Sequence, residues 1–142
     1  MSIFGRLFGK NAKPTVDDPA FGRIGFNPSH GIDMWCHIPS VPGEHMIIVD
    51  APLNGPTQAQ REFYSALHAC LAVREAECKA FIAKQADPPA NLSRMTIYSV
   101  EVGSEAEIAT GQFVIELSDS DANQIHRVEF KNGQPSVYGV DD

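Results

Sequence analysis

Residues that can hold a metal ion are present in this chain, but their spacing does not bring enough of them together. Cys36, His37 and His45 are the nearest candidates, on two neighbouring predicted strands. A zinc site needs three or four converging ligands, and the alternation of side chains along a strand sends Cys36 and His37 to opposite faces. The other three histidines have no spacing typical of a metal motif. We therefore predict no metal site and no cofactor.

The stretch DSDANQ (119–124) resembles the start of a calcium loop, because acidic or amide residues occupy alternate positions. An EF-hand also requires Gly at its sixth position and Glu at its twelfth. This chain has Gln124 and Phe130 at those positions, and the flanking segments have the pattern of strands. The stretch is therefore interpreted as a polar turn.

Motifs for nucleophilic catalysis or phosphate binding do not occur in the sequence. It contains no Gly-x-Ser-x-Gly elbow, no Gly-x-Gly-x-x-Gly stretch and no Walker loop. His68 and Cys70 lie in one predicted helix, where their side chains point about 200° apart and form no dyad. These observations favour a protein that is not an enzyme.

Acidic residues are the remaining candidates for a functional role, because of where they lie. The net charge is −7, and residues 1–100 carry nine acids and nine bases. Residues 101–142 carry nine acids against Arg127 and Lys131. This acidic segment would repel nucleic acid and favours a basic protein partner, although the acidity is also compatible with a role in solubility alone. The predicted partner-binding residues are Glu101, Glu105, Glu107, Glu116, Asp119 and Asp121.

The cysteines and the hydropathy pattern predict a cytoplasmic protein. The count of three cysteines is odd, and Cys70 and Cys78 would lie about 12 Å apart along one helix, too far for a disulfide. No run of about 18 apolar residues is present to span a membrane. The opening MSIFGRLFGK lacks the apolar core and cleavage site of a secretory signal.

Residues 1–16 are predicted to form an N-terminal tail or short amphipathic segment. Four apolar residues near the start fall on one helical face, and basic residues accompany them. Contact with a membrane surface through residues 1–13 is one interpretation, and a tail that packs on its own domain is the other. KPTVDDP is interpreted as a linker, and residues 17–142 as a single α+β domain.

The elements that would position these residues follow from periodicity. Residues 21–26, 34–39 and 44–51 have the pattern of strands, and their short connections favour antiparallel pairing. A broad apolar stripe then predicts one long helix over 57–86, with Asn54 or Thr57 as its N-cap. Strands resume at 95–102, with Tyr98, Val100 and Val102 on one face, and at 111–118.

A closing hairpin is predicted around Asn132-Gly133, the preferred type I′ pair. The sequence therefore predicts an α+β fold: an antiparallel sheet of six or seven strands in a meander–helix–meander order, covered on one face by the long helix. Arg74 interrupts the apolar stripe, which predicts a bend or break near residues 72–76, or a helix end that overhangs the sheet. Either arrangement would let Arg74 reach solvent or a carboxylate.

The segments DDPAFGRIGF, the strand with Trp35, GPTQAQREFYSAL and HRVEFKNGQPSVYGVDD resemble a group of small bacterial α+β domains. The resemblance covers most of residues 17–142. Relatives of this kind are often immunity proteins that neutralise bacterial toxins, so the resemblance implies a protein-binding role. Some related groups carry a Trp-Asp-Glu-Glu-His-Gly signature before the last hairpin, where this chain has SDSDANQIH.

Two functions are therefore expected. The first is a cytosolic protein-binding module, an immunity-type inhibitor that occludes a basic toxin with its acidic surface. The alternative is a small-ligand-binding or enzymatic domain with a pocket between helix and sheet, near Trp35, His37 and Arg74. Trp35 itself is expected to lie in the core.

Overall fold

The computed structural model describes residues 13–120 and 123–141, which build one eight-stranded sheet with helices against it. The strands are β1 (Thr15–Asp18), β2 (Gly22–Phe26), β3 (Met34–His37), β4 (Met46–Asp50), β5 (Thr96–Val102), β6 (Phe113–Ser118), β7 (Ile125–Lys131) and β8 (Gln134–Asp141). The helices are α2 (Gln58–Ala69), α3 (Leu71–Ala83), α4 (Glu105–Ala109) and the 3₁₀ turn η1 (Leu92–Arg94). The α+β class is confirmed.

The strands lie side by side in chain order, from β1 to β8. Every neighbouring pair is antiparallel except β4 and β5, which are parallel. The prediction of a wholly antiparallel sheet of six or seven strands is therefore only partly right. Helices α2 and α3 occupy the connection between β4 and β5, and a strand–helix–strand crossover of this length returns the chain in the same direction.

Strand β1 lies in the segment that was predicted to be a linker. It pairs antiparallel with β2 and begins at Thr15, two residues before the expected domain boundary. The turn between the two strands depends on Asp18, whose Oδ1 accepts hydrogen bonds from the N–H of Ala20 (2.9 Å) and Phe21 (3.1 Å). An aspartate that bonds the backbone two or three residues ahead stabilises a turn, so Asp18 ends β1 and begins the turn to β2.

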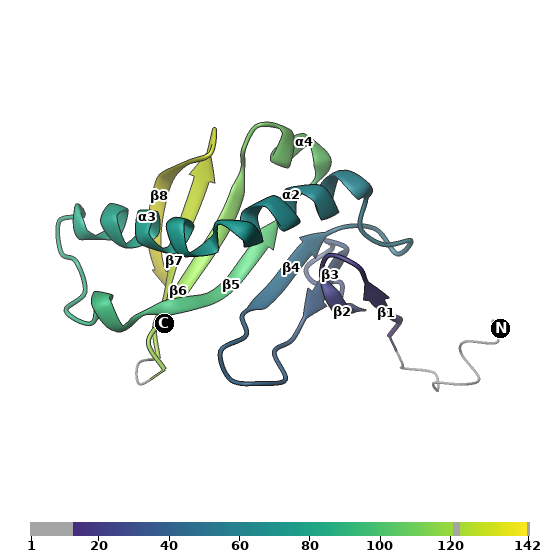
Figure 1. Ribbon diagram of the computed structural model, residues 1–142, viewed down its shortest axis with the longest axis horizontal. Helices are drawn as coiled ribbons and strands as arrows, with labels where there is room; N and C mark the ends of the chain where they lie inside the picture. Colours follow the sequence, from purple (N-terminus) through teal and green to yellow (C-terminus); the bar gives the residue numbers. More distant parts are fainter. Residues whose placement is uncertain (1–12, 121–122, 142) are drawn as a thin grey trace.

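The predicted helix over 57–86 is two helices. Thr57 caps α2 in a capping box with Gln60, as one of the two expected N-caps. The break falls at Cys70, whose φ of −120° and ψ of 29° leave the helical region. The expected break near 72–76 is thus displaced by a few residues, and Arg74 reaches the Glu77 carboxylate at 3.0 Å, as predicted. Figure 1 shows α2 and α3 end to end across the front of the sheet.

The core lies between α2–α3 and the sheet face that they cover. Tyr64, Leu67, Cys78 and Ile82 are its buried helix residues. The sheet contributes the expected inward residues Phe113, Ile115, Leu117, Val128 and Phe130. Trp35 is buried as predicted, and its indole N–H donates to the carbonyl oxygen of Pro52 at 2.8 Å.

Tyr98 does not share the face of Val100 and Val102. The register between β5 and β6 shifts between Ile97 and Ser99, which is a β-bulge. A bulge inserts one residue and re-aims the side chains around it. Val100 and Val102 are therefore buried, whereas Tyr98 is 41% exposed, and the prediction that the three share one face is wrong.

No helix within the described residues is long and apolar enough to cross a membrane. The predicted amphipathic segment lies almost wholly outside the described residues, which begin at residue 13.

Candidate functional site

The sheet has one face without a helix layer. Helix α4 contacts α2, and η1 contacts α3, so within the described residues the helices gather on the α2–α3 side. The register places Ile48, Glu101, Val114 and Glu129 next to one another across β4 to β7 on the opposite face. We call this the uncovered face. Apolar and acidic side chains alternate across it.

Arg127 lies at the centre of the uncovered face and contacts three carboxylates. Its two terminal nitrogens lie 2.9 Å from the two oxygens of Glu101, a bidentate pair. Longer contacts join its Nη1 to Glu116 (3.8 Å) and its Nε to Glu129 (3.6 Å). The hydrogen bond with Glu101 raises the pKa of Arg127, and the other two carboxylates add to this rise. Acid remains in excess, because one guanidinium faces three carboxylates.

Glu116 is fixed from its other side by Ser99. The Ser99 hydroxyl donates to Glu116 Oε1 at 2.6 Å, and both residues are buried although they lie on the uncovered face. The bidentate pair fixes Arg127 and Glu101, and the short hydrogen bond from Ser99 fixes Glu116, because charge-assisted hydrogen bonds hold both partners in one geometry. The side chains at the centre of the face are therefore held in one arrangement by their own contacts.

A groove of about 420 Å³ lies on the uncovered face beside this cluster. Ile48 and Val114 supply apolar lining. Its charged lining residues are Asp50, Glu101, Glu107 and Glu129 against Arg127 and Lys131. Desolvation raises the pKa of Asp50, and the negative charges of Glu107 and Asp33 raise it further. With four carboxylates against two cations, the charged lining of the groove keeps a net negative charge.

The structure separates the six predicted partner-binding acids. Glu101 and Glu116 belong to the Arg127 cluster, and Glu107 lines the groove. Glu105 is exposed on α4. Asp119 is buried, with its Oδ2 3.1 Å from Arg94 Nη2, so it contributes little to the surface. Asp121 lies outside the described residues.

Glu105 and Glu107 fall between the predicted strands 95–102 and 111–118, where no element was predicted, and the structure places them in a helix. They form the first turn of α4, where Ser104 caps the helix and Glu107 completes a capping box. The Ser-x-x-Glu spacing was a signal for this helix. Glu107 therefore has a structural role besides its place in the groove, and its replacement would disturb α4.

The three residues of the alternative pocket do not come together. Trp35 is in the core, and His37 on the same strand contacts the carbonyl oxygen of Arg23 (2.9 Å) and the carboxylate of Glu44 (3.4 Å). Arg74 instead stacks over Phe113 and Phe130 and donates to the carbonyl oxygen of Gly133 at 3.0 Å. Strands β3 and β6 are three positions apart in the sheet, about 14 Å at the usual strand spacing.

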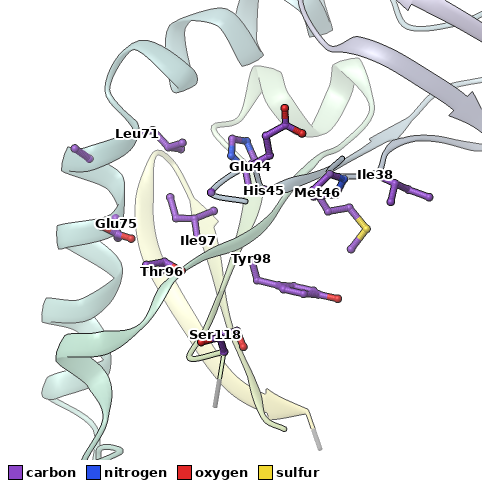
Figure 2. A pocket seen from close by; sticks show the side chains of 14 residues that line it. Ile38, Glu44, His45, Met46, Leu71, Glu75, Thr96, Ile97, Tyr98 and Ser118 are labelled. Carbon is purple, nitrogen blue, oxygen red and sulfur yellow. The ribbon is translucent and has the colours of Figure 1, made fainter. Parts of the chain in front are cut away.

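A different cavity, with a volume of about 740 Å³, lies where α3, the start of β5 and the loop before β4 come together. Figure 2 shows its walls: Leu71 and Glu75 on α3, Thr96 to Tyr98 on β5, and the loop from Ile38 to Met46. His45 is among its lining residues, and its Nε2 lies 2.9 Å from the hydroxyl of Tyr64. Sequence reasoning missed this cavity, because its residues come from segments that only the fold brings together.

Among the described residues, no group of three or more His, Cys, Asp or Glu side chains is placed to hold a metal ion. Comparisons with protein-family models, curated proteins and solved structures find no match to this chain.

Proposed function

We propose that this chain is a cytoplasmic protein-binding module, an immunity-type inhibitor that covers a basic surface of a toxin with its uncovered face. The observation that carries this proposal is the arrangement around Arg127: apolar side chains alternate with carboxylates on a sheet face that no described helix covers. The likeness of the sequence to immunity proteins agrees with it. Inhibition would result from occlusion of the substrate site of the toxin, so no catalytic residue is required.

The chemistry of the face fits a basic partner in two ways. Ile48, Val114 and Met34 offer apolar surface, which supplies most of the free energy of protein association. The carboxylates of Asp50 and Glu129 offer negative charge, which accelerates encounter with a basic surface and fixes its orientation. A lysine or arginine of the partner that enters the groove would also relieve the repulsion among Asp50, Glu107 and Asp33.

The test uses the full chain and two charge reversals, Asp50→Lys on the uncovered face and Glu62→Lys on α2 as the matched control. Both residues are exposed. Each protein is immobilised and exposed to an extract of cells that express it, and captured proteins are identified by mass spectrometry. We expect wild type and Glu62→Lys to capture the same basic protein and Asp50→Lys to lose it.

Kinetics and growth complete this test. With the captured protein, the association rate of wild type should fall steeply as salt rises, because ions screen charges beyond about 8–10 Å near physiological strength. Co-expression should also restore growth of cells that make the captured protein. An acidic partner, a salt-independent association rate or equal capture by Asp50→Lys would contradict the proposal. Thermal unfolding of each variant checks that it folds.

A further inference from the structure

We infer that the cavity between α3 and the start of β5 binds a small organic cation: an amine or quaternary ammonium with an aromatic or aliphatic body. Its volume of about 740 Å³ lies within the range of small-molecule sites, which is about 300–1,000 Å³. This site is separate from the groove on the uncovered face: the two share no lining residue. The inference does not depend on the proposed function.

The cavity exists because the parallel strands begin at different levels. Met46, the first residue of β4, pairs with Ser99, whereas β5 begins three residues earlier at Thr96. The start of β5 therefore extends past β4, and the loop before β4 turns away from it. Helix α3 passes along the side of this gap, as Figure 2 shows. The space is thus a consequence of the one parallel pair in the sheet.

The walls of the cavity carry apolar side chains that the fold leaves partly exposed. Leu71 and Ile97 belong to the edge of the core, and Ile38 is 72% exposed. The bulge in β5 turns Tyr98 away from the core and places it among the lining residues. Bulges re-aim side chains next to functional sites, and these side chains match the apolar body of a ligand.

The charges of the lining residues select a cation. Glu44 and Glu75 line the cavity, and no lysine or arginine does. Glu44 is already oriented, since its carboxylate accepts from the N–H of Ser40 (3.1 Å) and lies 3.4 Å from His37 Nε2. Glu75 makes no ion pair with another described residue, so its carboxylate is available to an ammonium group.

His45, the histidine that lines the cavity, adds no positive charge that would repel a cation. Desolvation lowers the pKa of His45, and the neighbouring His68 lowers it further. Its ring is therefore neutral at neutral pH, and its Nε2 lies 2.9 Å from the Tyr64 hydroxyl, with which it shares a hydrogen bond. The hydroxyls of Thr96 and Ser118 add hydrogen-bonding partners.

Three probes of one shape and different charge test the inference: benzylamine, benzyl alcohol and benzoate, each titrated into the ¹⁵N-labelled full chain and followed by NMR. We expect benzylamine to shift the amides of His45, Glu75 and Tyr98 in a saturable way. Benzyl alcohol should bind at least tenfold more weakly, because it cannot pair with a carboxylate, and benzoate should cause no saturable shift.

Two substitutions separate charge from shape. Glu75→Gln should weaken benzylamine binding on the order of tenfold and leave benzyl alcohol binding unchanged. Glu62→Gln, an exposed acid on α2 outside the cavity, should change neither. The inference is overturned if benzylamine shifts none of these amides, if amine and alcohol bind equally, or if Glu75→Gln has no effect. These outcomes leave the proposed function untouched, because Asp50 and the groove lie elsewhere.

Discussion

The Nε of Arg61 on α2 lies 2.8 Å from Oδ2 of Asp18, and this ion pair joins the first hairpin to the helix layer. The Asp18 side chain is only 2% exposed. Burial alone would raise the pKa of Asp18, but hydrogen bonds from Arg61 and from the N–H of Ala20 and Phe21 outweigh it and hold the pKa below 3.8. The carboxylate is therefore charged and fully engaged inside the fold.

Removal of this carboxylate should destabilise the protein strongly. Asp18→Ala leaves Arg61 and two backbone N–H groups without their acceptor, and we expect a loss of about 3–5 kcal/mol in the free energy of unfolding. The adjacent Asp17 is the control, because its side chain is 81% exposed and its pair with Arg23 is long (3.4 Å). Asp17→Ala should cost less than about 1 kcal/mol. Equal losses in urea unfolding would show that the buried pair has no special role.

Gln60 should matter far more than its neighbour Gln58. Its side-chain amide donates to the carbonyl oxygens of Asp50 (2.7 Å) and Gly103 (2.9 Å), just where the parallel strands end. Gln60→Leu leaves both carbonyls without this donor and removes the capping box, so we expect a loss of about 2–4 kcal/mol. Gln58→Leu, at an exposed position of the same turn, should change stability by less than about 1 kcal/mol. Urea unfolding of the two variants makes the comparison.

The two leucines of the predicted stripe should differ. Leu67 is buried, and Leu67→Ala should cost about 2–4 kcal/mol. Leu71 lines the cavity and is only partly buried, so Leu71→Ala should cost about 1–2 kcal/mol. Val73→Ala, at an exposed site on α3, should be close to neutral. A larger loss at Leu71 than at Leu67 in urea unfolding would mean that the cavity is closed in solution.

Stability should fall as the solution is acidified below about pH 6.5, because two histidines are held neutral. His126 is 2% exposed, and its Nδ1 lies 2.7 Å from the Tyr138 hydroxyl. Desolvation lowers the pKa of His126, as it does for His45. The pKa of each histidine is lower in the folded state than the unfolded value of 6.5. As the pH falls below 6.5, protons therefore bind the unfolded chain first, and the stability that the folded state has above pH 6.5 is lost. His126→Phe should flatten the dependence between pH 7 and 5, and NMR titration should give His126 a pKa under 6.5.

The three thiols should be free but unequal in reactivity. Cys78 is fully buried, and burial raises its pKa to about 12. Cys36 and Cys70 are partly exposed, and desolvation raises the pKa of Cys36. A thiol reagent should label Cys70 first and Cys36 more slowly, and should not reach Cys78 until the protein unfolds. In denaturant without reductant all three should react, and recovery of one thiol per chain would indicate a disulfide.

Local patterns in the sequence were enough to predict most of the elements. The alternation of residues 113–117 and the Asn132-Gly133 pair predict β6 and the β7–β8 hairpin, and both are confirmed. Thr57 was one of two predicted caps. These features are set by neighbouring residues, because periodicity and turn geometry depend on a few successive side chains. The break at Cys70 shows the limit of this approach, since the stripe continues across it.

The parallel pairing of β4 with β5 could also have been expected from the helices between them. The side-chain contacts that the sheet then creates between distant residues could not. Arg127 meets Glu101 across 26 residues, Arg61 meets Asp18 across 43, and Glu75 and Tyr98 become lining residues of one cavity. The sequence by itself determined an acidic surplus after residue 100 and the residues able to carry function. Only the tertiary structure decided which acids are neutralised and which remain open, because charges interact through space and their partners come from distant strands.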